Sequence, residues 1–170
     1  MKEQFITIGK SDVLRLGIKT DEGVETGEYL EFDLEDIELP LRYQELIEED
    51  KKNRAFLKNQ LLIINKRQDV KGKKLMSKNE EDKIKAVNEF FKKEVKVYNM
   101  FLGENGVQKL LNGRKLGWTS LREIDEIIEK QITPYIDIKI ENITDKIEKK
   151  YGVSNKEQNT LKMDDISDNE

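Results

Sequence analysis

The sequence contains no cysteine and no histidine. It therefore has no disulfide, no thiolate nucleophile, no Cys/His zinc site and no imidazole general base. Any enzyme built from this chain would depend on carboxylates, lysine, serine or tyrosine. These absences favour a binding or structural role over catalysis. We expect no catalytic residue, no bound metal and no cofactor.

Long hydrophobic runs are also missing. The longest purely apolar run, from Leu61 to Ile64, is far shorter than the roughly 20 residues that cross a bilayer. The first residues show no apolar signal core. We therefore expect a soluble, cytoplasmic protein with no membrane partner. Charged residues make up 39% of the 170-residue chain and hydrophobic residues 36%, which indicates a single domain with a modest core.

The net charge of -4 conceals a strong asymmetry along the chain. Residues 1–50 hold 15 acidic and five basic side chains, whereas residues 51–100 hold six acidic and 15 basic ones. Such blocks attract one another within a chain or between copies. Two interpretations remain open. The charges are either solvated helix faces or the basis of head-to-tail self-association, which high salt should disrupt.

The first 38 residues predict a small antiparallel β meander. Short strands are expected at Phe5–Ile8, Val13–Ile18 and Tyr29–Leu34, and apolar and polar residues alternate in the last two. Turn-forming residues, including Gly9 and Gly23, lie between them. A sheet of this size is marginal alone, so helices must cover one face.

Residues 39–152 predict helices that belong to the same domain as the meander. The first runs from about Pro40 to Gln68, with a polar stretch at Glu48–Arg54 that marks either a break or an exposed segment. A capping box at Ser77–Glu80 begins the second, which extends to about Leu102. A short helical turn follows at 107–112.

The last predicted helix starts near Thr119 and meets Pro134, which should kink or end it. An apolar stripe continues beyond the proline, so 135–151 can form a projecting helix. Residues 153–170 are polar and acidic, which predicts a disordered tail. The predicted fold class is α+β: a small N-terminal antiparallel meander packed against three or four α-helices.

The second predicted helix carries an apolar arc that is wider than one helix face. The apolar residues beyond that face are available to a partner. The candidate partner-binding residues are Phe90, Val97, Met100, Phe101 and Trp118. The alternative is that all five belong to the core, and it applies more to Phe90 and Phe101 than to Met100 and Trp118.

Residues 65–78 hold six basic side chains and one acidic side chain. Gly72 and the lack of periodicity indicate a loop. It is either a contact for nucleic acid or phosphate, or a solvated connector. The connector is favoured because no aromatic residue is interleaved for base stacking, so nucleic acid is not an expected partner. The basic residues are Lys66, Arg67, Lys71, Lys73, Lys74 and Lys78.

Three segments in order carry a resemblance to a known family. An acidic stretch at Phe32–Tyr43 precedes the charged helices, and an aromatic, glycine-containing stretch with a small apolar helix follows at Met100–Arg114. A helix then ends in the proline–aromatic pair of Ile132–Ile136. Over about residues 1–137 the chain resembles the tail assembly chaperones of long-tailed phages and prophages of Gram-positive, low-GC bacteria.

The resemblance implies a non-enzymatic assembly factor in the cytoplasm of the bacterial host. Such proteins keep the tape-measure protein soluble, recruit tail-tube subunits to it and are absent from the finished virion. A longer, frameshifted product is frequent among them. A structural tail component retained in the virion is the main alternative, and a nucleic-acid-binding regulator using the basic loop is a lesser one.

Overall fold

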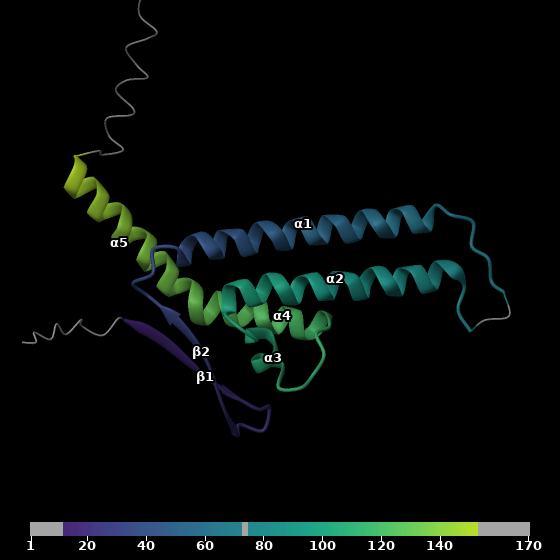
Figure 1. The fold of residues 1–170 in the computed structure, drawn as a ribbon, viewed down its shortest axis with the longest axis horizontal. Helices are drawn as coiled ribbons and strands as arrows, with labels where there is room; N and C mark the ends of the chain where they lie inside the picture. The colour runs from purple at the N-terminus through teal and green to yellow at the C-terminus, as the bar shows by residue number, and fades with distance from the viewer. Residues whose placement is uncertain (1–11, 73–74, 153–170) are drawn as a thin grey trace, which may run out of the picture.

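The fold of the chain is α+β, as the sequence predicts. A computed structural model describes residues 12–72 and 75–152, which form a two-stranded antiparallel sheet followed by helices (Figure 1). The predicted strand at 5–8 and the predicted tail at 153–170 lie outside the described residues. Two long helices form a hairpin that extends as an arm, and the sheet and shorter helices gather at its base.

The sheet pairs β1 (Val13–Lys19) with β2 (Glu25–Asp33). Their register places Leu16 opposite Leu30. Side chains alternate across a strand, so one face carries the apolar residues. Three side chains of that face are buried: Ile18, Leu30 and Phe32.

The hairpin consists of α1 (Leu39–Asn65) and α2 (Lys78–Leu102). Pro40 lies in the first turn of α1, where its missing amide proton costs nothing. The polar stretch at 48–54 does not break α1, which is continuous there. The predicted capping box begins α2: Ser77 Oγ accepts from the Glu80 amide at 3.2 Å, and Glu80 Oε2 accepts from the Ser77 amide at 2.7 Å.

A tight turn leads from α2 into the short helix α3 (Gly106–Leu111). A β-carbon at Gly106 would lie 2.4 Å from Cβ of Leu102, so this approach requires glycine. The next helix, α4 (Trp118–Ile127), begins one residue before the predicted Thr119, so its first residue is the only tryptophan of the chain.

Pro134 does not end the last helical segment, but the helix changes direction between α4 and α5, as the predicted kink requires (Figure 1). A π-helical turn, η1 (Ile128–Ile132), connects α4 to α5 (Thr133–Tyr151), and the Thr133 amide donates to the Ile128 carbonyl. This wider turn accommodates the proline, which has no amide proton to donate. Thr133 Oγ1 also lies 3.0 Å from the Tyr43 hydroxyl of α1, which fixes the start of α5 to the hairpin.

The core lies where the sheet, the base of the hairpin, α3, α4 and η1 meet. Phe101 is at its centre, with ring centroids 5.6 Å from Phe32 and 5.5 Å from Tyr43. Ile132 and Ile136 are both fully buried. Beyond Ile136, α5 runs away from the rest of the chain (Figure 1).

Candidate protein-docking surfaces

Two of the five predicted partner-binding residues belong to the core. Phe90 and Phe101 are each only 3% exposed. The aromatic rings of the sheet and α1 enclose Phe101, and Phe91 and Trp118 enclose Phe90. Val97 is half-buried against the same core. The prediction that Phe90 and Phe101 present a surface to a partner is therefore wrong, because tertiary packing uses both.

Met100 and Trp118 are exposed, but they do not share one strip. Met100 is 37% exposed and Trp118 is 53% exposed. Trp118 stacks on Phe90, and Met100 follows Phe90 by ten residues on α2, which is about 15 Å along the helix axis. The five predicted partner-binding residues therefore do not form one surface: some are buried, and the two exposed ones, Met100 and Trp118, lie far apart.

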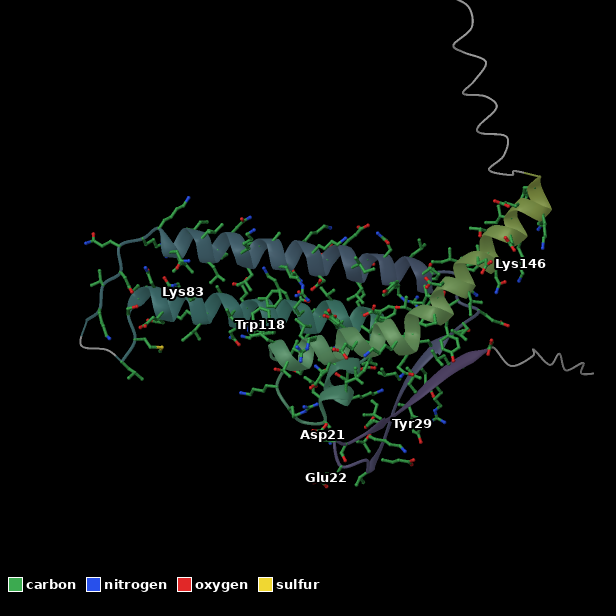
Figure 2. All side chains as sticks on the ribbon, turned by 180° about the vertical axis from the view of Figure 1, so that it is seen from behind. Asp21, Glu22, Tyr29, Lys83, Trp118 and Lys146 are labelled. Atoms are coloured by element: carbon green, nitrogen blue, oxygen red, sulfur yellow. The ribbon has the colours of Figure 1, made fainter. Side chains whose placement is uncertain are left out.

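Trp118 is held at the first turn of α4 against α2. Its ring lies 5.3 Å from Phe90 in a stacked arrangement and 4.8 Å from Phe91 edge-on. The turn before it is fixed by Ser120, whose Oγ accepts from the Gly117 amide at 2.9 Å. The contacts orient the indole, while half of it remains open to solvent beside α2 (Figure 2).

An apolar line continues from Trp118 along α2 toward the tip of the arm. Ile84, Val87 and Phe91 follow one another at steps of three and four residues, so they share a helix face. Val87 and Phe91 are half-buried and Ile84 is 56% exposed. Since α4 begins at Trp118 and runs toward the base of the arm, it leaves this distal face open (Figure 1). We call Ile84, Val87, Phe91 and Trp118 the Trp118 patch.

A second apolar line lies on α5. Ile140 is 45% exposed, Ile147 is 49% exposed and Tyr151 is 66% exposed, and Ile143 between them is half-buried. The line continues from the buried Ile136 at helical spacing. We call Ile140, Ile143, Ile147 and Tyr151 the α5 stripe. The sequence predicts this stripe and the projection of the helix, but residues 138–151 fall outside the family resemblance.

The predicted basic loop is attached to the start of α2. Asn79 donates from its side chain to the Arg67 carbonyl at 3.1 Å, and its amide donates to Asp69 at 3.1 Å. Asp82 pairs with Lys78 at 3.0 Å and with Arg67 at 3.2 Å. Hydrogen bonding from Lys78 lowers the pKa of the Asp82 carboxyl. Two of the six predicted bases are thus neutralised locally, which favours the connector interpretation.

The remaining basic residues of the loop divide into two groups. Lys66 and Lys71 are exposed. Lys73 and Lys74 lie outside the described residues, so the structure gives no position for them.

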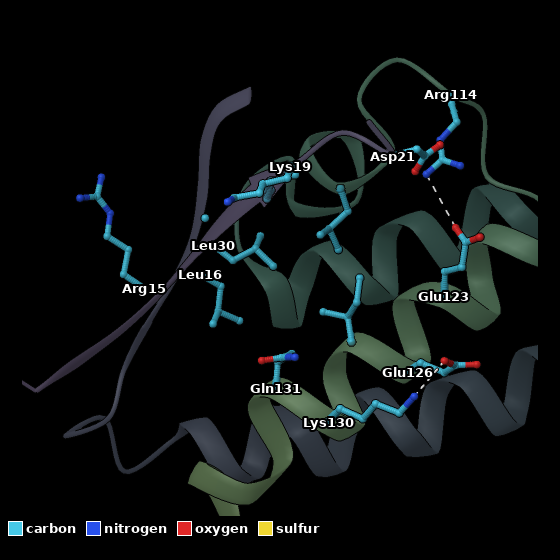
Figure 3. A pocket seen from close by; sticks show the side chains of 14 residues that line it. Arg15, Leu16, Lys19, Asp21, Leu30, Arg114, Glu123, Glu126, Lys130 and Gln131 are labelled. Atoms are coloured by element: carbon cyan, nitrogen blue, oxygen red, sulfur yellow. Dashed lines mark hydrogen bonds and ion pairs between the residues drawn. The ribbon is translucent and has the colours of Figure 1, made fainter. Parts of the chain in front are cut away.

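An open groove of about 650 Å³ lies between β1 and the α3–α4 region (Figure 3). Leu16, Leu30 and Ile127 contribute to its apolar part. Two acids of its lining pair with bases, Glu123 with Arg114 at 3.7 Å and Glu126 with Lys130 at 3.1 Å, and Asp21 also lines the groove. Glu123 and Glu126 therefore face bases and not one another.

A buried acid occupies the contact between the two helices of the hairpin. Glu94 is 0% exposed; Asn53 Nδ2 donates to its Oε1 at 2.8 Å, and its Oε2 has no hydrogen-bond partner. Burial raises the pKa of Glu94 to about 7, and the nearby carboxylate of Asp50 adds to the effect. A carboxylate removed from water is costly unless it is paired or protonated.

The neighbours of Glu94 connect the hairpin to α4. Arg54 binds Asp50 at 2.7 Å and reaches Asp125 of α4 at 3.6 Å. The Tyr98 hydroxyl donates to Asp125. Burial raises the pKa of Tyr98, and Asp125 adds to the shift. The polar stretch that interrupts the apolar pattern of α1 is therefore the polar part of a helix contact, which periodicity alone does not reveal.

The described residues, 12–72 and 75–152, contain no group of three or more acidic, histidine or cysteine side chains that could hold a metal ion. No described helix is long and apolar enough to cross a membrane. No family model, curated protein or solved structure matches the chain. The functional argument therefore depends on the residues of the chain itself.

Proposed function

We propose that this protein is a non-enzymatic tail assembly chaperone of a long-tailed phage or prophage. It binds the helical tape-measure protein and brings tail-tube subunits to it in the cytoplasm of the bacterial host. The resemblance of residues 1–137 motivates the proposal. The Trp118 patch is the single structural observation that carries it.

The patch suits an amphipathic helix as its ligand. Trp118 supplies a large rigid surface whose orientation is set by Phe90 and Phe91. Aromatic anchors of this kind dominate binding energy at protein interfaces. The open face of α2 extends the patch in a straight line toward Ile84, so a bound helix would continue the line of α4. An amphipathic helix docks through residues spaced at three and four, as this face does.

The small size of the patch matches a temporary complex. Two of its members are half-buried by the fold, and only Ile84 and Trp118 are largely exposed. Interfaces below about 1,200 Å² are typical of transient contacts. A chaperone needs contacts that a growing tail tube can displace. Lys83, which is half-buried and directly precedes Ile84 on α2, favours an acidic side chain at that end of the bound helix (Figure 2).

Co-expression with the tape-measure protein of the same phage tests the proposal. We expect the wild-type chain to keep that protein soluble and to co-purify with it. Ile84→Glu places a charge in the patch and should reduce co-purification by about tenfold. Met100→Glu is the matched control, since it makes the same kind of change at another exposed position of α2.

Two outcomes would contradict the proposal at different levels. If Ile84→Glu and Trp118→Ala keep the tape-measure protein as soluble as Met100→Glu does, the patch is not the docking surface. If the wild-type chain has no effect on solubility, the chaperone function itself is wrong. Mass spectrometry of purified virions should not detect the protein, and its presence there would favour the structural-component alternative.

A further inference from the structure

We propose that Glu94 acts as a pH switch: while its carboxyl group carries a proton, α4 and Trp118 stay packed against α2, and when it ionises they are released. The consequence for docking rests on the proposed function, whereas the movement itself does not. Glu94 is 0% exposed, and among the described residues its Oε2 is the one buried side-chain oxygen or nitrogen without a hydrogen-bond partner. The switch is therefore a buried acid that the folded chain leaves partly unsatisfied.

Glu94 lies midway along the contact between α2 and α4. Phe90, Glu94 and Tyr98 follow one another at steps of four residues, so they share one face of α2. At one end of this face, Phe90 stacks on Trp118, the first residue of α4. At the other end, the Tyr98 hydroxyl donates to Asp125 of the same helix. The helix α4 is thus attached to α2 on both sides of the buried acid.

The charged groups around Glu94 come from three helices. Asp50 and Arg54 of α1 both act on it. Arg54 binds Asp50 at 2.7 Å and also reaches Asp125 of α4 at 3.6 Å. Tyr98 of α2 stays protonated, because burial and the hydrogen bond to Asp125 raise its pKa. One guanidinium therefore serves two carboxylates while Glu94 is protonated, and three once Glu94 is ionised.

Ionisation of Glu94 should break the weakest contact of this set. A buried carboxylate is costly unless a cation pairs with it, and Arg54 is the cation that acts on Glu94. Movement of the guanidinium toward Glu94 takes it away from Asp125, because that contact is longer than the pair with Asp50. The helix α4 then loses its ionic contact with α1, and Trp118 separates from Phe90.

The proton affinity of Glu94 sets the size of the effect. Burial raises the pKa of Glu94 from 4.5 to about 7, and the charge of Asp50 and a hydrogen bond with its carboxyl group add to the shift. Release of α4 lets water reach the acid and returns its pKa toward 4.5. Release is therefore favoured more strongly as the pH rises through this interval, by at most about 300-fold, and gains nothing further above about pH 7.

The fluorescence of Trp118 in the full chain tests the switch, because the chain has no other tryptophan. Emission and acrylamide quenching are measured from about pH 5 to about pH 8 at constant ionic strength. For the wild type, we expect the emission to shift to longer wavelength and the quenching to increase as the pH rises, with a constant helical circular dichroism signal. Unchanged emission and quenching would overturn the proposal. A loss of helical signal in step with them would also overturn it, since that reports global unfolding.

Glu94→Gln separates the switch from other effects of pH. The amide cannot ionise and keeps an acceptor for Asn53, so this variant should show the low-pH fluorescence at every pH. Glu89→Gln is the matched control, because it makes the same change at an exposed position of α2, and it should titrate as the wild type does. A titration of Glu94→Gln with the wild-type amplitude would overturn the assignment to Glu94.

The switch and the chaperone function fail separately, because the fluorescence measurement uses this chain alone. Co-purification with the tape-measure protein should be greater at about pH 6 than at about pH 8 for the wild type, and equal at both for Glu94→Gln. Equal co-purification of the wild type at the two pH values would overturn the role of the switch in docking. Absence of co-purification at both would contradict the proposed function and leave the fluorescence result standing.

Discussion

The helices α2 and α5 carry similar apolar lines, but the fold buries much of the first line and leaves most of the second exposed. Both repeat large apolar side chains at steps of three and four, and both are rich in charge on the remaining faces. On α2 the fold buries Phe90, Tyr98 and Phe101, whereas on α5 it buries only Ile136. The difference lies in the neighbouring elements: α2 lies between α1 and α4 (Figure 1), whereas α5 leaves the core after its first turn.

This contrast separates two uses of an amphipathic helix. The α2 line contributes free energy of folding to a single chain through the apolar area that it removes from water. The α5 stripe removes less apolar area from water, because three of its four side chains are 45–66% exposed. Substitutions in the buried part of the α2 line should therefore lower the free energy of unfolding more than substitutions in the α5 stripe.

The largest expected effect comes from the centre of the α2 line. Phe101→Ala removes a ring that contacts Phe32 and Tyr43 in a buried site, and we expect it to lower the free energy of unfolding by about 4 kcal/mol. Its neighbour Met100 is exposed, so Met100→Ala should cost less than about 1 kcal/mol. Urea denaturation of both variants measures the difference. Similar losses for the two would contradict the burial assigned to them.

The change from a buried to an exposed apolar position takes place within a single turn of α5. Ile136 is fully buried, and Ile136→Ala should lower the free energy of unfolding by about 3 kcal/mol. Ile140 follows one turn later and is 45% exposed, so Ile140→Ala should change the free energy by less than about 0.5 kcal/mol. Denaturation at sub-micromolar protein keeps self-association from contributing. A large loss from Ile140→Ala would show that the body of the protein covers the stripe.

The buried acid of α2, Glu94, should have a smaller effect on the free energy of unfolding, and this effect should depend on pH. The folded pKa of Glu94 is raised to about 7, so the folded state holds a proton that the unfolded state releases near pH 4.5. Its contribution to stability is therefore complete below about pH 4.5 and is lost as the pH rises to about 7, a change of at most about 3 kcal/mol.

Glu94→Gln isolates this contribution. The amide keeps an acceptor for Asn53 and carries no charge, so the variant should be more stable than the wild type at pH 8 by about 1–2 kcal/mol and equal to it near pH 4.5. Thermal denaturation across this range, with Glu89→Gln at an exposed position of α2 as control, measures the effect. A wild-type stability that rises from pH 5 to 8 relative to Glu94→Gln would contradict the assignment.

The local elements of this protein follow from residues that act over a few positions. Ser77 and Glu80 cap the start of α2, alternating residues form β1 and β2, and Pro40 lies in the first turn of α1. Capping, alternation and proline geometry depend only on neighbours in sequence. The two apolar lines are likewise predictable from spacing. Whether each line is buried or exposed cannot be predicted in this way, because spacing identifies a helix face without identifying what packs against it.

Contacts between residues far apart in the chain decided which apolar side chains are buried and how the last helix continues. Phe90 and Phe101, two of the predicted partner-binding residues, belong to the core because Trp118, Phe32 and Tyr43 of other elements cover them. Pro134 predicts a kink or an end; the helix continues through a π turn and changes direction there (Figure 1), and Thr133 contacts Tyr43 of α1 at the start of α5. The sequence by itself determined the α+β class, the helices and their apolar faces. Only the tertiary structure decided which faces are covered, since burial depends on partners far away in the chain.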